Sequence, residues 1–205
     1  MNRTLVTVLG NTPKPARYAF DGAEPVDARL APAALIKLLP QTLRPSEIVA
    51  LCTPEARKTS WPLLEQDLAG CEIKVTCADV AAQEQNNFAA FSRKVADRIP
   101  RDPAPTDLMV DVTHGPRHLA MFTLLAVQYV SALRRIELAG VYYGRLETST
   151  EPSQIVDLRP LLDLSEWLYA LRVFDEAADA RPLGELLKRD RSQPHEPQRM
   201  SDELR

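Results

Sequence analysis

Five short runs of β-branched and other apolar residues recur along the first 150 residues, and a helical pattern separates each run from the next. The runs are TLVTVLG (4–10), EIVALCT (47–53), EIKVTC (72–77), DLMVDVT (107–113) and RIELAGVYYG (135–144). Most of them are apolar at consecutive positions, which is typical of strands covered by helices on both faces. The alternation predicts an α/β fold with a doubly wound, mostly parallel sheet and helices on both of its faces.

Further segments extend this core. RYAF (17–20), the DG dipeptide and EPVDA predict a small inserted hairpin. SQIVDL (153–158) predicts a late strand, in antiparallel orientation, and residues 160–180 predict a long amphipathic helix. Beyond this helix the sequence is polar. We therefore expect a core domain over 1–150, a strand and helix extension packed on it over 151–180, and a polar tail or linker over 181–205.

Composition argues against several classes of protein. The chain of 205 residues carries a net charge of −3, so it lacks the basic field of a duplex nucleic-acid binder. It contains no 18-residue apolar run, so no membrane helix is expected, and its first residues predict a strand rather than a signal peptide. Its three cysteines show no CxxC spacing and predict buried, reduced thiols, and hence a cytoplasmic protein.

Polar residues follow the predicted strands, at the edge of a parallel sheet where ligands bind. They are Gly10, Asn11 and Thr12 after the first strand, Thr53 after the second, Asn86 beyond the third, and Thr113 to Arg117 after the fourth. Neither GxGxxG nor GxxxxGK[ST] occurs, which argues against a standard dinucleotide or Walker-type site. Backbone N–H groups at helix N-termini, with hydroxyls and Arg117, instead suit a phosphodiester or another anion.

The segment DVTHGPRH leaves several interpretations open. Asp111 either shapes the loop or takes part in the chemistry of the site. His114 is either a hydrogen-bonded loop histidine or a ligand contact, and Arg117 either contacts the ligand or pairs with a local carboxylate. Gly115 is expected to have a positive φ, and His118 to lie on a helix face. The i, i+4 spacing of the two histidines is that of a zinc pair, but no third ligand is evident, so no metal and no other cofactor is expected.

DVTHGPRH resembles the Asp-x-Thr-His-Gly signature of the CRISPR-associated DxTHG proteins, whose core is a CARF domain, a CRISPR-associated Rossmann fold. Three further segments are similar to the same family in a consistent order: CTPEARKTSW (52–61), VYYGRLE (141–147) and IVDLRPLLDLSEWLYALRVF (155–174). The resemblance covers roughly residues 1–175. It implies a Rossmann-like sheet, a homodimer, and a cyclic oligoadenylate ligand, commonly the tetra-adenylate, which is the second messenger of type III CRISPR antiviral signalling.

The resemblance also implies where the ligand lies. The ring crosses the dimer axis and contacts the loops after the first, second and fourth strands, whereas Asp111 shapes its loop. Ring phosphates suit Arg117, hydroxyls and backbone amides, and adenines suit the side-chain amides of Asn11 or Asn86. The helix over 116–133 has more apolar surface than one sheet face requires, and we expect it to help form the dimer interface.

Family members usually continue into an effector domain, often an RNase with an Arg-x(4–6)-His motif. Arg189 and His195 match that spacing within the polar tail, and we interpret the match as coincidence. Either the effector domain is missing from this chain, or the chain is a small stand-alone protein that controls a separate effector.

Three functions compete at this point. The first is a sensor that binds cyclic oligoadenylate without cleaving it. The second is a ring nuclease, in which a ribose 2′-OH attacks its own phosphate while His114 and Arg117 position the ring and stabilise charge. The third is a structural or RNA-binding role, which the net charge and the absence of a basic-aromatic stripe disfavour. We expect the sensor.

Overall fold

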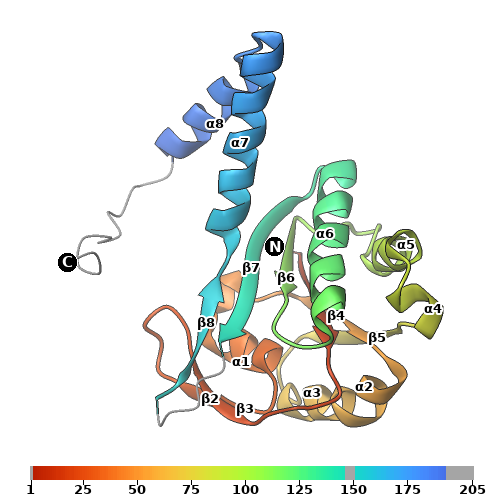
Figure 1. The fold of residues 1–205 in the computed structure, drawn as a ribbon. Helices are drawn as coiled ribbons and strands as arrows, with labels where there is room; N and C mark the ends of the chain where they lie inside the picture. Colours follow the sequence, from red (N-terminus) through yellow and green to blue (C-terminus); the bar gives the residue numbers. More distant parts are fainter. Residues whose placement is uncertain (1, 146–150, 193–205) are drawn as a thin grey trace. The chain divides into compact units, whose positions relative to one another are not determined.

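The computed structural model describes residues 2–145 and 151–192. In these ranges eight strands form one sheet in the order β3-β2-β8-β7-β6-β1-β4-β5 (Figure 1). The chain forms two compact units, Met1–Arg159 and Pro160–Arg205. The first unit contains the whole sheet, and it therefore extends past the boundary expected at residue 150. No helix in the described ranges is long and apolar enough to cross a membrane.

The five predicted core strands are present and all parallel. They are β1 (Arg3–Leu9), β4 (Glu47–Cys52), β5 (Lys74–Asp79), β6 (Asp107–Asp111) and β7 (Glu137–Arg145). Every residue of β1 and β4 is buried, as expected of central strands with helices on both faces. The predicted Rossmann-like fold is therefore confirmed.

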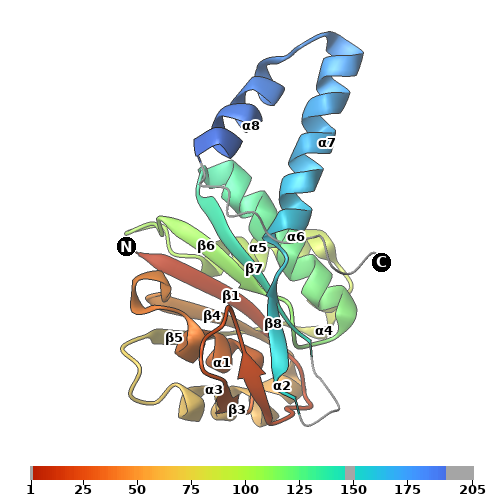
Figure 2. The same cartoon turned by 90° about the vertical axis from the view of Figure 1, so that its left-hand side faces the viewer.

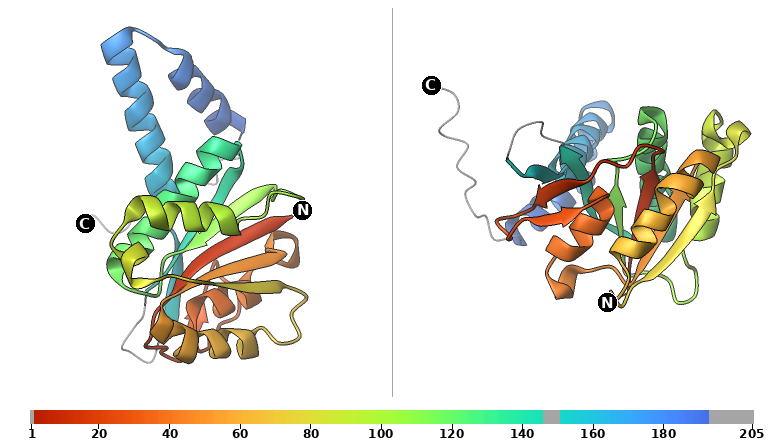
Figure 3. Two further views of the ribbon diagram at one scale, coloured as in Figure 1. Left: turned by 90° about the vertical axis from the view of Figure 1, so that its right-hand side faces the viewer. Right: turned by 90° about the horizontal axis from the view of Figure 1, so that it is seen from below.

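The helices divide between the two faces of the sheet (Figures 2 and 3). One face carries α1 (Ala31–Leu38), α2 (Pro54–Thr59) and α3 (Trp61–Asp67), with the short 3₁₀ helix η1 (Gln41–Leu43) before β4. The other face carries α4 (Ala82–Gln85), α5 (Phe88–Arg98) and α6 (Arg117–Arg134). Because β1 pairs with β4 on one side and with β6 on the other, the strand order switches at β1. The carboxyl ends of β1 and β6 are thus the place where such sheets bind ligands.

The helical segment between β4 and β5 is divided into two helices, α2 and α3. Ser60 ends α2, and Pro62 lies in the first turn of α3. Because proline has no N–H to donate to the preceding turn and its ring clashes there, one continuous helix through this position is disfavoured. The break leaves the Ser60 hydroxyl free to donate a hydrogen bond to the carbonyl of Gly10.

The inserted hairpin and the late strand are both confirmed. β2 (Ala16–Ala19) and β3 (Val26–Ala28) pair antiparallel, and Asp21 and Gly22 in their connection have positive φ. β8 (Ser153–Asp157) pairs antiparallel with β7, as expected, and parallel with β2. Among the described residues, the hairpin therefore joins the main sheet through β8, a strand that is more than 130 residues further along the chain.

The second unit corrects one expectation. α7 (Arg159–Ala177) covers the predicted amphipathic helix, but residues expected as a polar tail form a further helix, α8 (Arg181–Ser192). Leucines recur on α8 with helical spacing, and the Arg189 guanidinium lies 3.4 Å from Asp163 and 2.6 Å from Glu166 of α7. Apolar spacing and ion pairing thus outweigh the polar composition of this segment. His195 lies outside the described residues.

Candidate functional site

The DxTHG loop, residues 111–115, is held by a buried carboxylate. Asp111, the last residue of β6, is buried, and its Oδ2 accepts a hydrogen bond from the Thr7 hydroxyl at 2.7 Å. Its Oδ1 accepts from the Thr113 hydroxyl, and Thr113 Oγ1 in turn accepts from the backbone N–H of Gly144 at 2.7 Å. Burial raises the pKa of the Asp111 carboxyl. The ends of β1, β6 and β7 are thereby tied together, which is the arrangement that a loop-shaping role requires.

His114 lies behind the loop surface. His114 is only 8% exposed, and its Nε2 accepts a hydrogen bond from the Ala31 N–H at 2.9 Å. Ala31 begins α1, so the imidazole satisfies a donor at this helix N-terminus. An accepting Nε2 requires the neutral imidazole, and burial lowers the pKa of His114 accordingly. Of the two interpretations of His114, the geometry favours the hydrogen-bonded loop histidine.

Two glycines bring the switch-point loops into contact. Gly115 has φ of +88°, as expected, which allows the chain to turn from β6 into α6. A Cβ placed on Gly10 would lie 2.8 Å from the Gly115 backbone nitrogen. Only glycine at position 10 therefore permits this approach of the two loops.

Replacing Gly10 by alanine is expected to lower the free energy of unfolding by about 2 kcal/mol, because backbone atoms cannot yield as a flexible side chain does. Chemical denaturation measures this loss. Gly184→Ala is the control, because Gly184 lies within α8 and a Cβ added to it meets nothing within 4 Å. Equal stability of Gly10→Ala and the wild type would contradict the close approach.

A cavity of about 380 Å³ opens beside this loop. Its lining residues are Val112, Thr113, Gly115, Arg117, Ala120, Met121, Leu124 and Tyr143. One side is polar, with the first turn of α6 and an exposed Arg117 whose guanidinium makes no ion pair with the described part of the chain. The other side is apolar, with Met121 and Leu124 from α6 and Tyr143 from β7. Such a cavity suits a ligand that combines an anion with a flat apolar group.

The other predicted site residues do not line this cavity. Thr53 is buried, and its hydroxyl accepts from the Ala56 N–H at 3.3 Å as the N-cap of α2. Asn11 and Thr12 are exposed after β1, and the Thr12 hydroxyl donates to the Asn11 side chain at 3.0 Å. Asn86 is exposed at the end of α4. The structure therefore brings Thr113, Gly115 and Arg117 to the cavity, with Gly10 and His114 supporting the loop from behind.

Sequence reasoning missed three supporting positions. Gly144 packs so closely on the loop that a Cβ there would lie 3.0 Å from Thr113 Cγ2 and 3.1 Å from the Ala31 Cβ. Ser60 holds Gly10, and the Ala31 N–H holds His114. Gly144 could have been found from the sequence, because it directly follows two tyrosines at the end of a predicted strand. Backbone donors and carbonyls leave no signal in a sequence.

The expected position of His118 on a helix face is confirmed, and the two tyrosines near the loop differ in burial. Tyr142 is buried, whereas Tyr143 is 41% exposed, so only one tyrosine of the pair reaches solvent. His118 lies on the exposed face of α6, and its ring contacts the edge of Phe122 at 5.9 Å between centroids.

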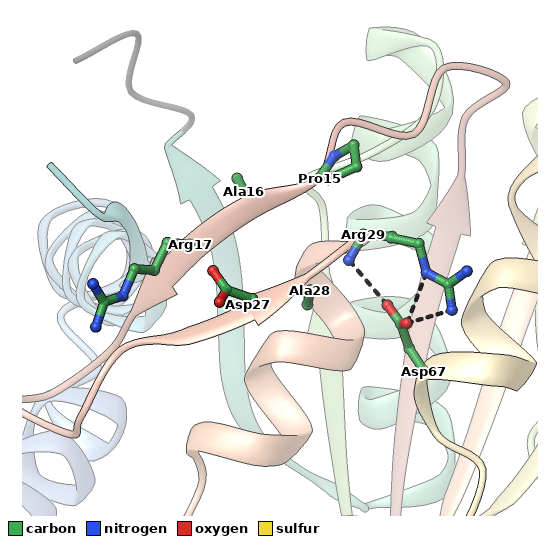
Figure 4. A pocket seen from close by; sticks show the side chains of 7 residues that line it. All are labelled: Pro15, Ala16, Arg17, Asp27, Ala28, Arg29 and Asp67. Carbon is green, nitrogen blue, oxygen red and sulfur yellow. Dashed lines mark hydrogen bonds and ion pairs between the residues drawn. The ribbon is translucent and has the colours of Figure 1, made fainter. Parts of the chain in front are cut away.

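A second cavity, of about 490 Å³, lies beside the hairpin (Figure 4). Its main feature is Arg29, whose guanidinium donates to Asp67 from Nε at 2.8 Å and from a terminal nitrogen at 2.6 Å, while its backbone N–H donates at 2.9 Å. Burial opposes ionisation of Asp67, but Arg29 outweighs this effect and lowers the pKa of the carboxyl. The pair neutralises its own charge. The Arg29–Asp67 pair therefore offers no free cation to an anionic ligand, and its hydrogen bonds fix the chain ahead of α1.

Comparisons with known proteins agree with this structure. No family model matches the chain. Over 86 residues, 41% of this chain, it is 26% identical to the CRISPR-associated protein MJ1674 of Methanocaldococcus jannaschii, of which the match covers 14%. The fold is similar to that of Enterococcus italicus Csm6 bound to cyclic hexa-2′-fluoro-hexa-dAMP, with a TM-score of 0.56 and 12% identity over 93% of this chain. The chain spans 51% of that protein's length. The chain is thus similar over part of its length to a CRISPR-associated protein, and its Rossmann-like fold is similar to that of Csm6.

Proposed function

We propose that this chain is a sensor that binds cyclic oligoadenylate at the DxTHG loop, in a groove shared by two copies of the chain. The observation that carries the proposal is the cavity beside the loop. There Arg117 and the first turn of α6 offer donors to a phosphate, while Tyr143 and Met121 offer apolar surface to an adenine. The cyclic adenylate analogue held by Csm6 supports the same class of ligand.

The size of the cavity favours a dimer. At about 380 Å³, it is near the lower end of the roughly 300–1,000 Å³ that suits one drug-sized molecule, so a ring of several nucleotides does not fit into it. A two-fold dimer presents two such cavities to one ring, and each copy of the loop then binds equivalent parts of the ligand.

One face of α6 supplies a surface for such a dimer. Four large apolar side chains at intervals of four residues are exposed there: Met121 (66%), Leu125 (48%), Tyr129 (56%) and Leu133 (65%). This confirms that α6 carries more apolar surface than its packing on the sheet uses. Met121 also lines the cavity, so the stripe is continuous with the proposed ligand site. We propose that two copies of this stripe pack together.

Replacing Leu125 by glutamate is expected to convert the dimer into a monomer, because it places two charges in the middle of an apolar interface. Sedimentation velocity measures the change. Leu43→Glu is the matched control, since Leu43 is 46% exposed on η1, away from α6. A Leu125→Glu protein that sediments as a dimer would place the interface elsewhere.

Cleavage of the ring is the less favoured alternative. His114 is buried and its Nε2 is occupied by the Ala31 N–H, so it is poorly placed to exchange protons with a ribose. Arg117 remains able to stabilise a developing charge, but it does not act as a base at neutral pH. We therefore propose binding without cleavage.

Calorimetric titration of the purified chain with cyclic tetra-adenylate, cyclic hexa-adenylate and linear tetra-adenylate tests the proposal, with chromatography of each ligand afterwards. The expected result is one intact cyclic tetra-adenylate bound per two chains, with weaker binding of cyclic hexa-adenylate and of linear tetra-adenylate. Tighter binding of cyclic hexa-adenylate, whose ring has six nucleotides like the ligand of Csm6, would revise the ring size of the ligand and leave the proposed binding site unchanged. A linear product would establish the ring nuclease instead. Absence of binding to both rings would refute the proposed function.

A further inference from the structure

Two of the three cysteines touch each other at the edge of the sheet. Cys52 is the last residue of β4, and Cys77 lies on β5, the edge strand that pairs with β4. The register places Cys77 opposite Ala50, so both thiols point to the same face of the sheet. Cys52 Sγ and Cys77 Sγ lie 2.9 Å apart, within hydrogen-bond distance of each other.

The surroundings of the pair distinguish the two thiols. Cys52 is fully buried, whereas Cys77 is partly exposed on the edge strand. The side-chain hydrogen bond with Cys52 and then the Arg57 guanidinium lower the pKa of Cys77, against the opposing effect of burial. The hydrogen bond with Cys77 and burial raise the pKa of Cys52. Cys77 is thus the nucleophilic, accessible thiol, and Cys52 is the protonated neighbour directly behind it.

We propose that Cys52 and Cys77 form a reversible disulfide, which makes this edge of the sheet a modification site for peroxides. The sequence predicts reduced thiols, and that prediction describes the resting state of the pair. A bonded S–S distance is about 2.05 Å, so the sulfurs need to approach by about 0.9 Å from their separation of 2.9 Å. In the part of the chain that the structure describes, β5 pairs with β4 alone, so a small shift of β5 disturbs one ladder of hydrogen bonds rather than two.

The chemistry balances with hydrogen peroxide as the oxidant. The Cys77 thiolate attacks one peroxide oxygen, an S–O bond forms, the O–O bond breaks, and the hydroxide that leaves takes up a proton to become water. The Cys52 sulfur then attacks the Cys77 sulfur, the S–S bond forms, and the S–O bond breaks. The second oxygen leaves as water with the Cys52 proton. The two sulfurs lose two electrons in all, and the peroxide gains two; a dithiol such as dithiothreitol reverses the change.

The third cysteine provides the control. Cys71 lies before β5 begins, at the opposite end of that strand from the carboxyl edge, and is partly exposed. Lys58 and Lys74 separate the three cysteines, so trypsin releases each of them on its own peptide. A disulfide between any two is therefore identified without ambiguity by mass spectrometry.

The test exposes the reduced, purified chain to hydrogen peroxide and then counts alkylatable thiols after unfolding. The expected result is a fall from three thiols to one, a cross-linked peptide pair containing Cys52 and Cys77, and recovery of three thiols with dithiothreitol. Cys71→Ser is expected to form the same disulfide, and Cys52→Ser is expected to leave Cys77 as a sulfenic acid. Arg57→Ala is expected to slow the reaction several-fold.

Three results would overturn the proposal: persistence of all three thiols, a disulfide that includes Cys71, or a sulfinic acid on Cys77 while Cys52 stays reduced. None of these readouts involves cyclic oligoadenylate. The redox site therefore stands or fails independently of the proposed function.

Discussion

Replacing Arg117 by alanine is expected to weaken the binding of cyclic oligoadenylate by about 100-fold and to leave the free energy of unfolding unchanged. Arg117 is exposed at the start of α6 and lines the cavity, and its guanidinium makes no ion pair with the described residues. A hydrogen bond to a charged group is worth about 1.5–3 kcal/mol, and the dimer loses two such groups. A total of about 3 kcal/mol corresponds to roughly a hundredfold change in affinity.

Calorimetric titration measures the affinity, and urea denaturation measures the stability. Arg98→Ala is the matched control, because Arg98 is also an exposed helical arginine but lies at the C-terminal end of α5. It removes the same charge from the molecule without touching the cavity. Equal loss of affinity in both variants would indicate a general effect of net charge. Unchanged affinity of Arg117→Ala would move the ligand away from this cavity.

Replacing Asp111 by alanine is expected to lower the free energy of unfolding by about 3 kcal/mol. The buried carboxylate accepts hydrogen bonds from the hydroxyls of Thr7 and Thr113, and alanine leaves both hydroxyls without this partner inside the protein. Because Thr113 also holds the Gly144 N–H, the loop loses its connection to β7 as well. Ligand affinity is expected to fall together with the stability.

Asp111→Asn separates the shape of this network from its charge. Asparagine keeps an acceptor for the Thr113 hydroxyl, and its amide donates to the Thr7 oxygen once that hydroxyl has rotated. We expect a smaller loss, about 1 kcal/mol, because no hydroxyl is left unpaired. Urea denaturation of both variants provides the comparison. If Asp111→Ala stays within about 0.5 kcal/mol of the wild type, Asp111 does not hold the loop.

The sequence alone was sufficient to predict the core of the sheet. Strands that are buried on both faces must be apolar at consecutive positions, and this constraint is visible in β1, β4 and β6 without any structure. The same reasoning located polar residues at strand ends and selected the DxTHG segment. The end of the helix at Ser60 was predictable in principle from Pro62, whereas α8 was missed because its polar composition outweighed the spacing of its leucines.

The candidate site depended on the sequence for its location and on the tertiary structure for its roles. The residue types predicted that His114 and Arg117 lie near a ligand, but they did not show that the two residues have different roles. The structure separates them, because the Ala31 N–H occupies His114 Nε2 while Arg117 faces the cavity. That hydrogen bond joins atoms 83 residues apart and uses a backbone donor that every residue except proline carries.

Local patterns thus determined which segments form strands, where the chain turns, and which edge of the sheet carries polar groups, since these depend on near neighbours in the sequence. The tertiary structure decided which side chains face the cavity, which serve the loop from behind, and which thiols meet. Those outcomes depend on distances between segments that only the folded sheet brings together, such as Gly10 against Gly115 and Cys52 against Cys77.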